Sequence, residues 1–124
     1  MPTPESKVKD AIKAVLKKHG AYFFMPATYG YGKSGVPDIV ACVASRFVAV
    51  ECKTIGNDPT TLQYKNLQAI ADTGGLACIC DETSYTALDH MLNTLHNSND
   101  TTSFRYYDLR QETILPKRRA NRKA

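Results

Sequence analysis

Apolar residues recur every three or four positions in three stretches of the chain, which is the spacing of one face of an amphipathic helix. The first stretch follows Thr3 and Pro4 and ends at Gly20, the second follows Thr60 or Thr61 and ends at Gly74 and Gly75, and the third starts at Thr83 or Ser84. Each start has a hydroxyl residue that can cap a helix. We predict three helices, whose apolar faces are Val8, Ala11, Ile12, Val15 and Leu16; Leu62, Leu67, Ile70 and Ala71; and Tyr85, Leu88, Met91, Leu92 and Leu95.

Runs rich in β-branched and aromatic residues predict strands between these helices. They cover residues 21–25, 38–44, 46–54 and 76–80, and residues 104–109 can add an edge strand after a loop that starts at His96. So few residues separate the second run from the third that only a tight antiparallel hairpin fits. The order of helices and strands predicts an α/β fold with a mixed central sheet flanked by helices.

The length of 124 residues predicts one domain, which can bury a sufficient core without disulfides or metal. We assign residues 1–109 to this domain and residues 110–124 to a disordered basic tail. The longest apolar run, residues 39–44, is far shorter than the roughly 20 residues that span a bilayer. Lysines interrupt every candidate signal-peptide window. We therefore expect a cytoplasmic protein, in the host cytoplasm if the source is viral, without membrane contact.

Charge is distributed unevenly around a net value of +4. Residues 1–33 have a net charge of +4, residues 34–104 of −5, and residues 105–124 of +5. An acidic centre between two basic ends suits a site that holds a divalent cation and contacts a polyanion such as DNA. The alternative interpretation is that the charges serve solubility alone.

All four cysteines lie in apolar, strand-like runs, at positions 42, 52, 78 and 80. We predict that these thiols are free, reduced and mostly buried. The histidines, His19, His90 and His96, stand at no zinc-ligand spacing. None of them is placed to activate a cysteine, so the sequence does not favour Cys-His catalysis.

The predicted hairpin brings three ionisable residues together. Asp38 begins one arm, and Glu51 and Lys53 stand near the end of the other, so antiparallel pairing places them at the same edge. Alternation puts Glu51 and Lys53 on one face of the sheet and Cys52 on the other. Asp38 and Glu51 can offer oxygen ligands to Mg²⁺, with the backbone carbonyl of Cys52 as a third. The alternative interpretation of Glu51 and Lys53 alone is a buried salt bridge or an edge-strand pair.

These residues form an ordered series of motifs. Gly35, Val36, Pro37 and Asp38 precede the hairpin, Glu51, Cys52 and Lys53 end it, Gln63 stands at the start of the next helix, and Glu5 lies on the first helix. In this order the chain resembles the PD-(D/E)xK nuclease superfamily and, within it, the small VRR-NUC domains. The resemblance covers about residues 5–92 and implies a restriction-endonuclease-like core.

The resemblance also implies residue roles and an activity. Asp38 and Glu51 would bind Mg²⁺, with Mn²⁺ able to substitute and the Cys52 carbonyl contributing. Lys53 would orient or activate the attacking water, Gln63 would support the site, and Glu5 would be a peripheral acid. The implied activity is that of a homodimeric endodeoxyribonuclease selective for branched DNA such as Holliday junctions. The alternatives are a less selective or end-processing nuclease of replication, repair or phage genome processing, and a catalytically silent DNA-binding protein.

Two further segments are candidates for DNA contact. Tyr29 and Tyr31 can stack on bases and Lys33 can contact phosphate. The basic residues of the tail can contact phosphates too; they are Lys117, Arg118, Arg119, Arg122 and Lys123. A nucleotide-binding P-loop ending at Ser34 is excluded, since Ala27 stands where its first glycine belongs and Pro37 opposes the helix that must follow.

Overall fold

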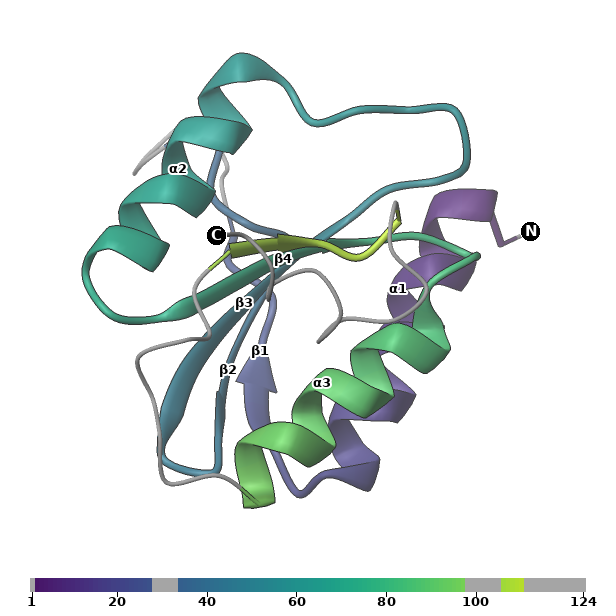
Figure 1. Ribbon diagram of the computed structural model, residues 1–124. Helices are drawn as coiled ribbons and strands as arrows, with labels where there is room; N and C mark the ends of the chain where they lie inside the picture. The colour runs from purple at the N-terminus through teal and green to yellow at the C-terminus, as the bar shows by residue number, and fades with distance from the viewer. Residues whose placement is uncertain (1, 28–33, 98–105, 111–124) are drawn as a thin grey trace, which may run out of the picture.

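The computed structural model describes residues 2–27, 34–97 and 106–110. Its elements follow the predicted order (Figure 1): α1 (Pro4–Lys18), β1 (Tyr22–Phe24), β2 (Ile39–Val43), β3 (Arg46–Cys52), α2 (Thr61–Asp72), β4 (Leu76–Cys80), α3 (Tyr85–Asn97) and β5 (Tyr106–Asp108). Thr3 caps α1, and Thr60 rather than Thr61 caps α2. The α3 helix extends to Asn97 and so includes His96, which was expected to begin a loop.

The five strands form one mixed sheet in the order β1-β2-β3-β4-β5. Antiparallel pairs join β1 to β2 and β2 to β3, whereas β3, β4 and β5 run parallel. The turn between β2 and β3 has positive φ angles at Ala44 (50°) and Ser45 (68°). Such angles favour glycine or asparagine. Ala44 and Ser45 therefore both adopt an unfavourable backbone conformation in this tight hairpin. The mixed sheet of the prediction is confirmed.

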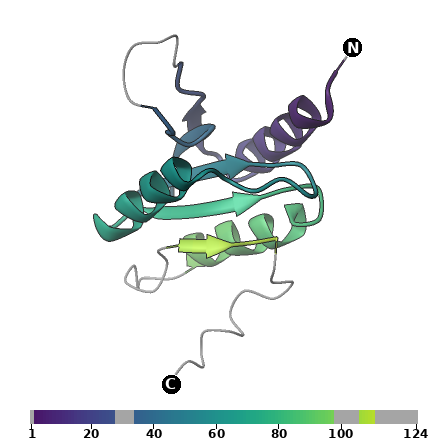
Figure 2. The ribbon, with the colours of Figure 1, turned by 90° about the horizontal axis from the view of Figure 1, so that it is seen from above.

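Helices cover both faces of the sheet. The α1 and α3 helices pack on one face, and α2 packs on the other; seen from above, α2 lies in front of the strands and α3 behind them (Figure 2). On the first face Val8, Ile12 and Leu16 of α1 join the core around Val50 and Cys78. On the second face a smaller cluster forms from Leu67 of α2 with Ala77 and Ile79 of β4. Every residue of β4 is consequently buried.

Burial differs from the predicted pattern at one apolar position. Leu62, predicted on the apolar face of α2, is 46% exposed, and Asn66 takes a buried position on α2 instead. The cysteines are free and mostly buried, as predicted: Cys42 is exposed, and the other three are buried. Cys42 shares its sheet face with Tyr22 and Phe47, and the cluster under α2 is built on β4 and β5 rather than on β2, so no helix of the described residues packs over Cys42.

No helix in the described part of the chain is long and apolar enough to cross a membrane.

Candidate active site

The register of the β2–β3 hairpin places Asp38 beside Glu51. Ile39 pairs with Val50, so the residue before β2 faces the residue after Val50 on the neighbouring strand. The Oδ2 atom of Asp38 accepts a hydrogen bond from the backbone N–H of Cys52 at 2.9 Å. One carboxylate oxygen of Asp38 is therefore fixed by the backbone of β3, which leaves Oδ1 for another partner.

Glu51 is a buried carboxylate to which none of the described residues donates a hydrogen bond. Its side chain is 1% exposed, and neither of its oxygens has a hydrogen-bond partner among the described residues. Burial, followed by the negative charge of Asp38, raises the pKa of Glu51 to about 8. A buried charge without donors is costly unless another group compensates it. Glu51 thus has two oxygens available to a cation.

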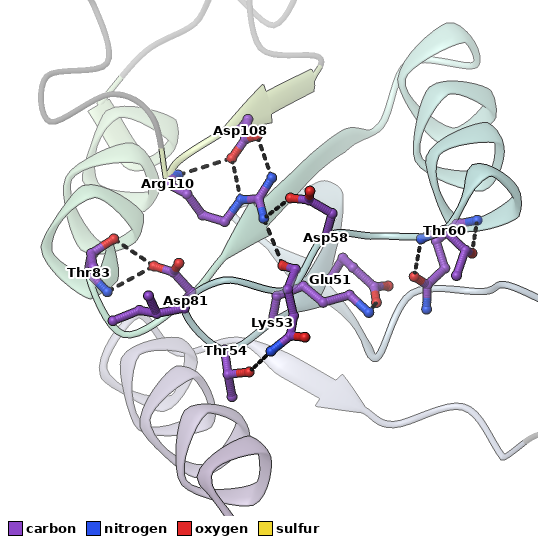
Figure 3. Close-up of polar contacts among 12 residues, drawn as sticks. Glu51, Lys53, Thr54, Asp58, Thr60, Asp81, Thr83, Asp108 and Arg110 are labelled. Carbon is purple, nitrogen blue, oxygen red and sulfur yellow. Dashed lines mark hydrogen bonds and ion pairs between the residues drawn. The ribbon is translucent and has the colours of Figure 1, made fainter.

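Lys53 forms an ion pair with Glu51. Its Nζ lies 3.6 Å from Glu51 Oε2, beyond hydrogen-bond distance, and Figure 3 shows the two side chains pointing toward one another. Its backbone N–H donates to the carbonyl of Cys80 at 3.0 Å, which extends the pairing of β3 with β4 to this point. Beside Lys53 lies a pocket of about 300 Å³ lined by Glu5, Cys52, Lys53, Thr54, Asn57 and Asp58. Lys53 therefore lies between the buried carboxylate of Glu51 and the pocket.

The segment that leads into Asp38 is held by α2. Gly35 has a φ of +74°, and a Cβ there would lie 2.6 Å from Cγ of Leu62. Only glycine fits, because both the conformation and the close approach exclude a side chain. The side-chain amide of Asn66 donates to the carbonyls of Ser34 (3.2 Å) and Leu62 (3.0 Å). Asn66 is a positioning residue that the sequence analysis did not identify. The one indication of its role in the sequence is that a polar residue stands beside the apolar face of a helix.

Arg110 anchors the loop that forms the far wall of the pocket. Its guanidinium donates to Asp58 Oδ1 and to the carbonyl of Asn57, both at 3.0 Å, and to Asp108 Oδ2 at 2.9 Å (Figure 3). Hydrogen bonding to Asp108 is the main reason that the pKa of Arg110 is raised. Arg110 was assigned to the basic tail, and nothing local in the sequence pointed to this long-range contact.

Gln63 and Glu5 occupy the starts of α2 and α1. The Oε1 atom of Gln63 accepts from the backbone N–H of Thr60 at 2.8 Å, and Thr60 Oγ1 accepts from the backbone N–H of Gln63 at 3.2 Å. Gln63 therefore serves a capping box, and only its NH₂ group remains for the site. Glu5 lines the same pocket as Lys53 and lies 3.4 Å from Lys9 Nζ.

The other predicted site residues lie outside the described part of the chain. They are Tyr29, Tyr31 and Lys33 of the glycine-rich loop, and Lys117, Arg118, Arg119, Arg122 and Lys123 of the tail. Their contacts with DNA stay predictions.

The donor set fits a small divalent cation. Among the described residues no group of three or more His, Cys, Asp or Glu side chains is arranged to hold a metal ion. Two carboxylates are nevertheless available, Asp38 through Oδ1 and Glu51 through two buried oxygens without a donor. Mg²⁺ commonly uses one or two carboxylates and completes its shell with water and phosphate oxygens.

Comparison with solved structures finds a similar fold. A structure described as a VRR_NUC domain matches with a TM-score of 0.61 and 19% sequence identity, over 73% of this chain and 96% of that chain. No family model matches the sequence, and no curated protein matches it. Because nearly the whole of the VRR_NUC domain is matched, the chain has the fold of that domain, as the sequence resemblance implied.

Proposed function

We propose that this chain, whose fold is that of a VRR-NUC domain, is a divalent-metal-dependent nuclease that hydrolyses phosphodiester bonds of DNA. The observation that carries the proposal is the buried carboxylate of Glu51 beside Asp38, which receives no hydrogen bond from the described part of the chain. Asp38 Oδ1, the Glu51 oxygens and the Cys52 carbonyl would hold Mg²⁺ or Mn²⁺. When bound, such an ion stabilises charge on the scissile phosphate and lowers the pKa of a coordinated water.

Other residues of the site would orient the attacking water, hold Asp38 in place and support the active site. Lys53 extends from the end of β3 toward the pocket, so its ammonium can orient the attacking water and contact a phosphate oxygen. Asp38 is held by the Cys52 N–H, which orients its free oxygen before any ligand arrives. Gln63 supports the site through its NH₂ group, and Glu5 is a peripheral acid on the pocket wall.

Cleavage by carboxylate variants tests the activity. We expect Asp38→Asn and Glu51→Gln to abolish Mg²⁺-dependent cleavage of labelled DNA, because each removes a charged ligand at nearly constant volume. Asp10→Asn is the matched control, since Asp10 is an exposed acid of α1 paired with Lys13 outside the pocket. A wild-type chain that binds DNA and never cuts it would favour the catalytically silent alternative.

More specifically, we propose that the nuclease is an endonuclease selective for branched DNA such as Holliday junctions, and that it acts in recombination or repair in the cytoplasm. It is supported by the sequence resemblance and by the fold. A panel of single-stranded, duplex, flap and four-way DNA, each with and without Mg²⁺, tests it. Equal cleavage of all four substrates would favour the less selective nuclease, and cleavage confined to ends would favour the end-processing one.

We also propose that two copies associate through the sheet face that α2 leaves uncovered. Tyr22 (74% exposed), Phe24 and Phe47 protrude there around a hollow of about 180 Å³. A second hollow of about 380 Å³, next to α2, shares Val40 and Phe47 with the first. Protruding aromatics beside apolar hollows on one patch suit a two-fold contact, in which the patch meets its own copy.

Light scattering tests this contact. We expect a dimer for the wild-type chain and a monomer for Tyr22→Glu, which places a charge on the patch. Ile55→Glu is the control, because Ile55 is an exposed apolar residue on the loop after β3, away from the two hollows. A monomeric wild-type chain would rule the contact out.

The basic tail is proposed to contact phosphates outside the active site. Removing residues 117–124 should weaken binding of all DNA shapes about equally. If the tail makes two or three phosphate contacts, the slope of log affinity against log salt should fall by roughly two to three. An unchanged slope would mean that the tail makes no such contact.

A further inference from the structure

Lys9 brings a second ammonium group to the candidate metal centre. Its Nζ lies 3.8 Å from Asp38 Oδ1 and 3.4 Å from Glu5 Oε2. The Asp38 oxygen that it approaches is the one that the backbone of Cys52 leaves free. Lys9 therefore lies next to Asp38 Oδ1, the oxygen that we propose as a ligand of the metal.

The surroundings keep Lys9 charged. Its side chain is 24% exposed, and partial burial works against the ammonium, but the charges of Asp38 and Glu5 outweigh this effect and raise the pKa of Lys9. At neutral pH the ammonium is thus present and offsets the negative charge of Asp38, while Lys53 lies on the other side of the pair, beside Glu51.

The contact between Lys9 and Asp38 is an exchangeable one. The separation of 3.8 Å exceeds a hydrogen bond, so an ion pair joins the two groups without a directional contact. Lysine is a compact charge on a flexible stem, which can leave one partner for another at small cost. A divalent cation on Asp38 Oδ1 would repel the ammonium of Lys9 and would replace it as the partner of Asp38.

We propose that Lys9 is a built-in counter-ion, which neutralises Asp38 in the metal-free protein, is displaced when a divalent cation binds, and then contacts a phosphate of the DNA. This inference rests on the proposed metal site. Lys9 is a positioning residue in the free protein and becomes a substrate contact only in the loaded complex. The alternative is that Lys9 merely stabilises α1 through its pairing with Glu5 one turn earlier.

The same helix provides a matched control. Lys13, one turn after Lys9, pairs with Asp10 at 3.4 Å and has a similarly exposed side chain (31%). Neither residue lines the pocket beside Lys53. Replacing Lys9 or Lys13 by Met therefore removes one lysine charge and one ion pair of α1 while keeping an unbranched apolar side chain, and only the first change affects Asp38.

Calorimetric titration of the DNA-free chain with Mn²⁺ tests the competition. We expect Lys9→Met to bind Mn²⁺ about five- to tenfold more tightly than wild type, because the ion no longer has to displace the ammonium of Lys9. A change of this size is ordinary for the coupling between two ligands. Lys9→Arg, which keeps the charge, and Lys13→Met should bind like wild type. In EDTA at pH 8.5, where Glu51 has released its proton, Lys9→Met should also melt at a lower temperature than Lys13→Met, since the two carboxylates then repel each other with less compensation.

DNA binding in Ca²⁺, in place of Mg²⁺, tests the second role. Lys9→Met should lower the salt slope by about one relative to Lys13→Met, because one phosphate contact is lost. Equal Mn²⁺ affinity of wild type and Lys9→Met would overturn the counter-ion role, and equal slopes would overturn the phosphate contact. If the wild-type chain binds no Mn²⁺ at all, the proposed metal site fails and the counter-ion role fails with it.

Discussion

The carboxylate of Asp38, immediately before β2, accepts a hydrogen bond from the backbone N–H of Cys52, the last residue of β3, at 2.9 Å. This contact orients Asp38 beside Glu51 and leaves its other oxygen facing Lys9. A single hydrogen bond therefore joins the stability of the hairpin to the geometry of the candidate metal centre.

Substitutions of Asp38 should separate these two effects. Asp38→Ala leaves the Cys52 N–H without its acceptor, so we expect a loss of about 1–3 kcal/mol in the free energy of unfolding. Asp38→Asn keeps a carbonyl oxygen that can accept this bond, and should lose less than half as much stability while still losing cleavage. Chemical denaturation of both variants measures the difference. Equal destabilisation by Ala and Asn would show that the hydrogen bond contributes nothing.

The raised pKa of Glu51 predicts how stability depends on pH. Between the ordinary value of 4.5 and the folded-state value of about 8, the unfolded chain has released a proton that the folded chain retains. The metal-free protein should therefore lose stability as pH rises through this window, with the loss complete above pH 8. We expect the contribution to be on the order of a few kcal/mol.

Glu51→Gln isolates that contribution, because the amide does not titrate. Denaturation in EDTA at pH 5.5 and pH 8.5 should show a larger decrease in stability for wild type than for Glu51→Gln. The same decrease in both proteins would mean that Glu51 does not titrate in this range.

Two glycines of nearly equal φ allow a test of the close approach before Asp38. Gly35 (φ +74°) and Gly20 (φ +73°) both strain an added side chain, but only at Gly35 would a Cβ meet other residues, Leu62 first and Asn66 next. We expect Gly20→Ala to cost about 1–2 kcal/mol and Gly35→Ala clearly more, with a loss of cleavage as Asp38 shifts. Adding Leu62→Ala should recover part of the loss at Gly35 only. Equal costs at the two glycines would contradict the contact.

Thiol accessibility tests the arrangement of the cysteines. Burial raises the pKa of Cys80 to about 12 and also raises the pKa values of Cys52 and Cys78, so these thiols should not react in the native state. We expect one cysteine, Cys42, to react natively and all four to react in denaturant. Cys42→Ser should abolish the native reaction. Reaction of a second thiol would indicate that the sheet opens.

Local patterns predicted the elements and the meeting of Asp38 with Glu51, because helix caps, strand alternation and hairpin register all depend on residues close in sequence. The contributions of Lys9, Asn66 and Arg110 come from contacts with residues distant in sequence, so no local pattern revealed them. Local patterns did not reveal the exposure of Cys42 and Leu62 for a related reason. Their burial depends on which strands α2 covers, and the period of a helix or strand does not contain that information.

We propose that Asp38 and Glu51 bind one divalent cation together. Anomalous diffraction from crystals containing Mn²⁺ can locate such a cation. We expect one manganese peak about 2.0–2.2 Å from Asp38 Oδ1 and from a Glu51 oxygen, with Lys9 moved away from Asp38. A crystal at saturating Mn²⁺ with no peak between these carboxylates, and with Lys9 and Lys53 still paired to them, would contradict it.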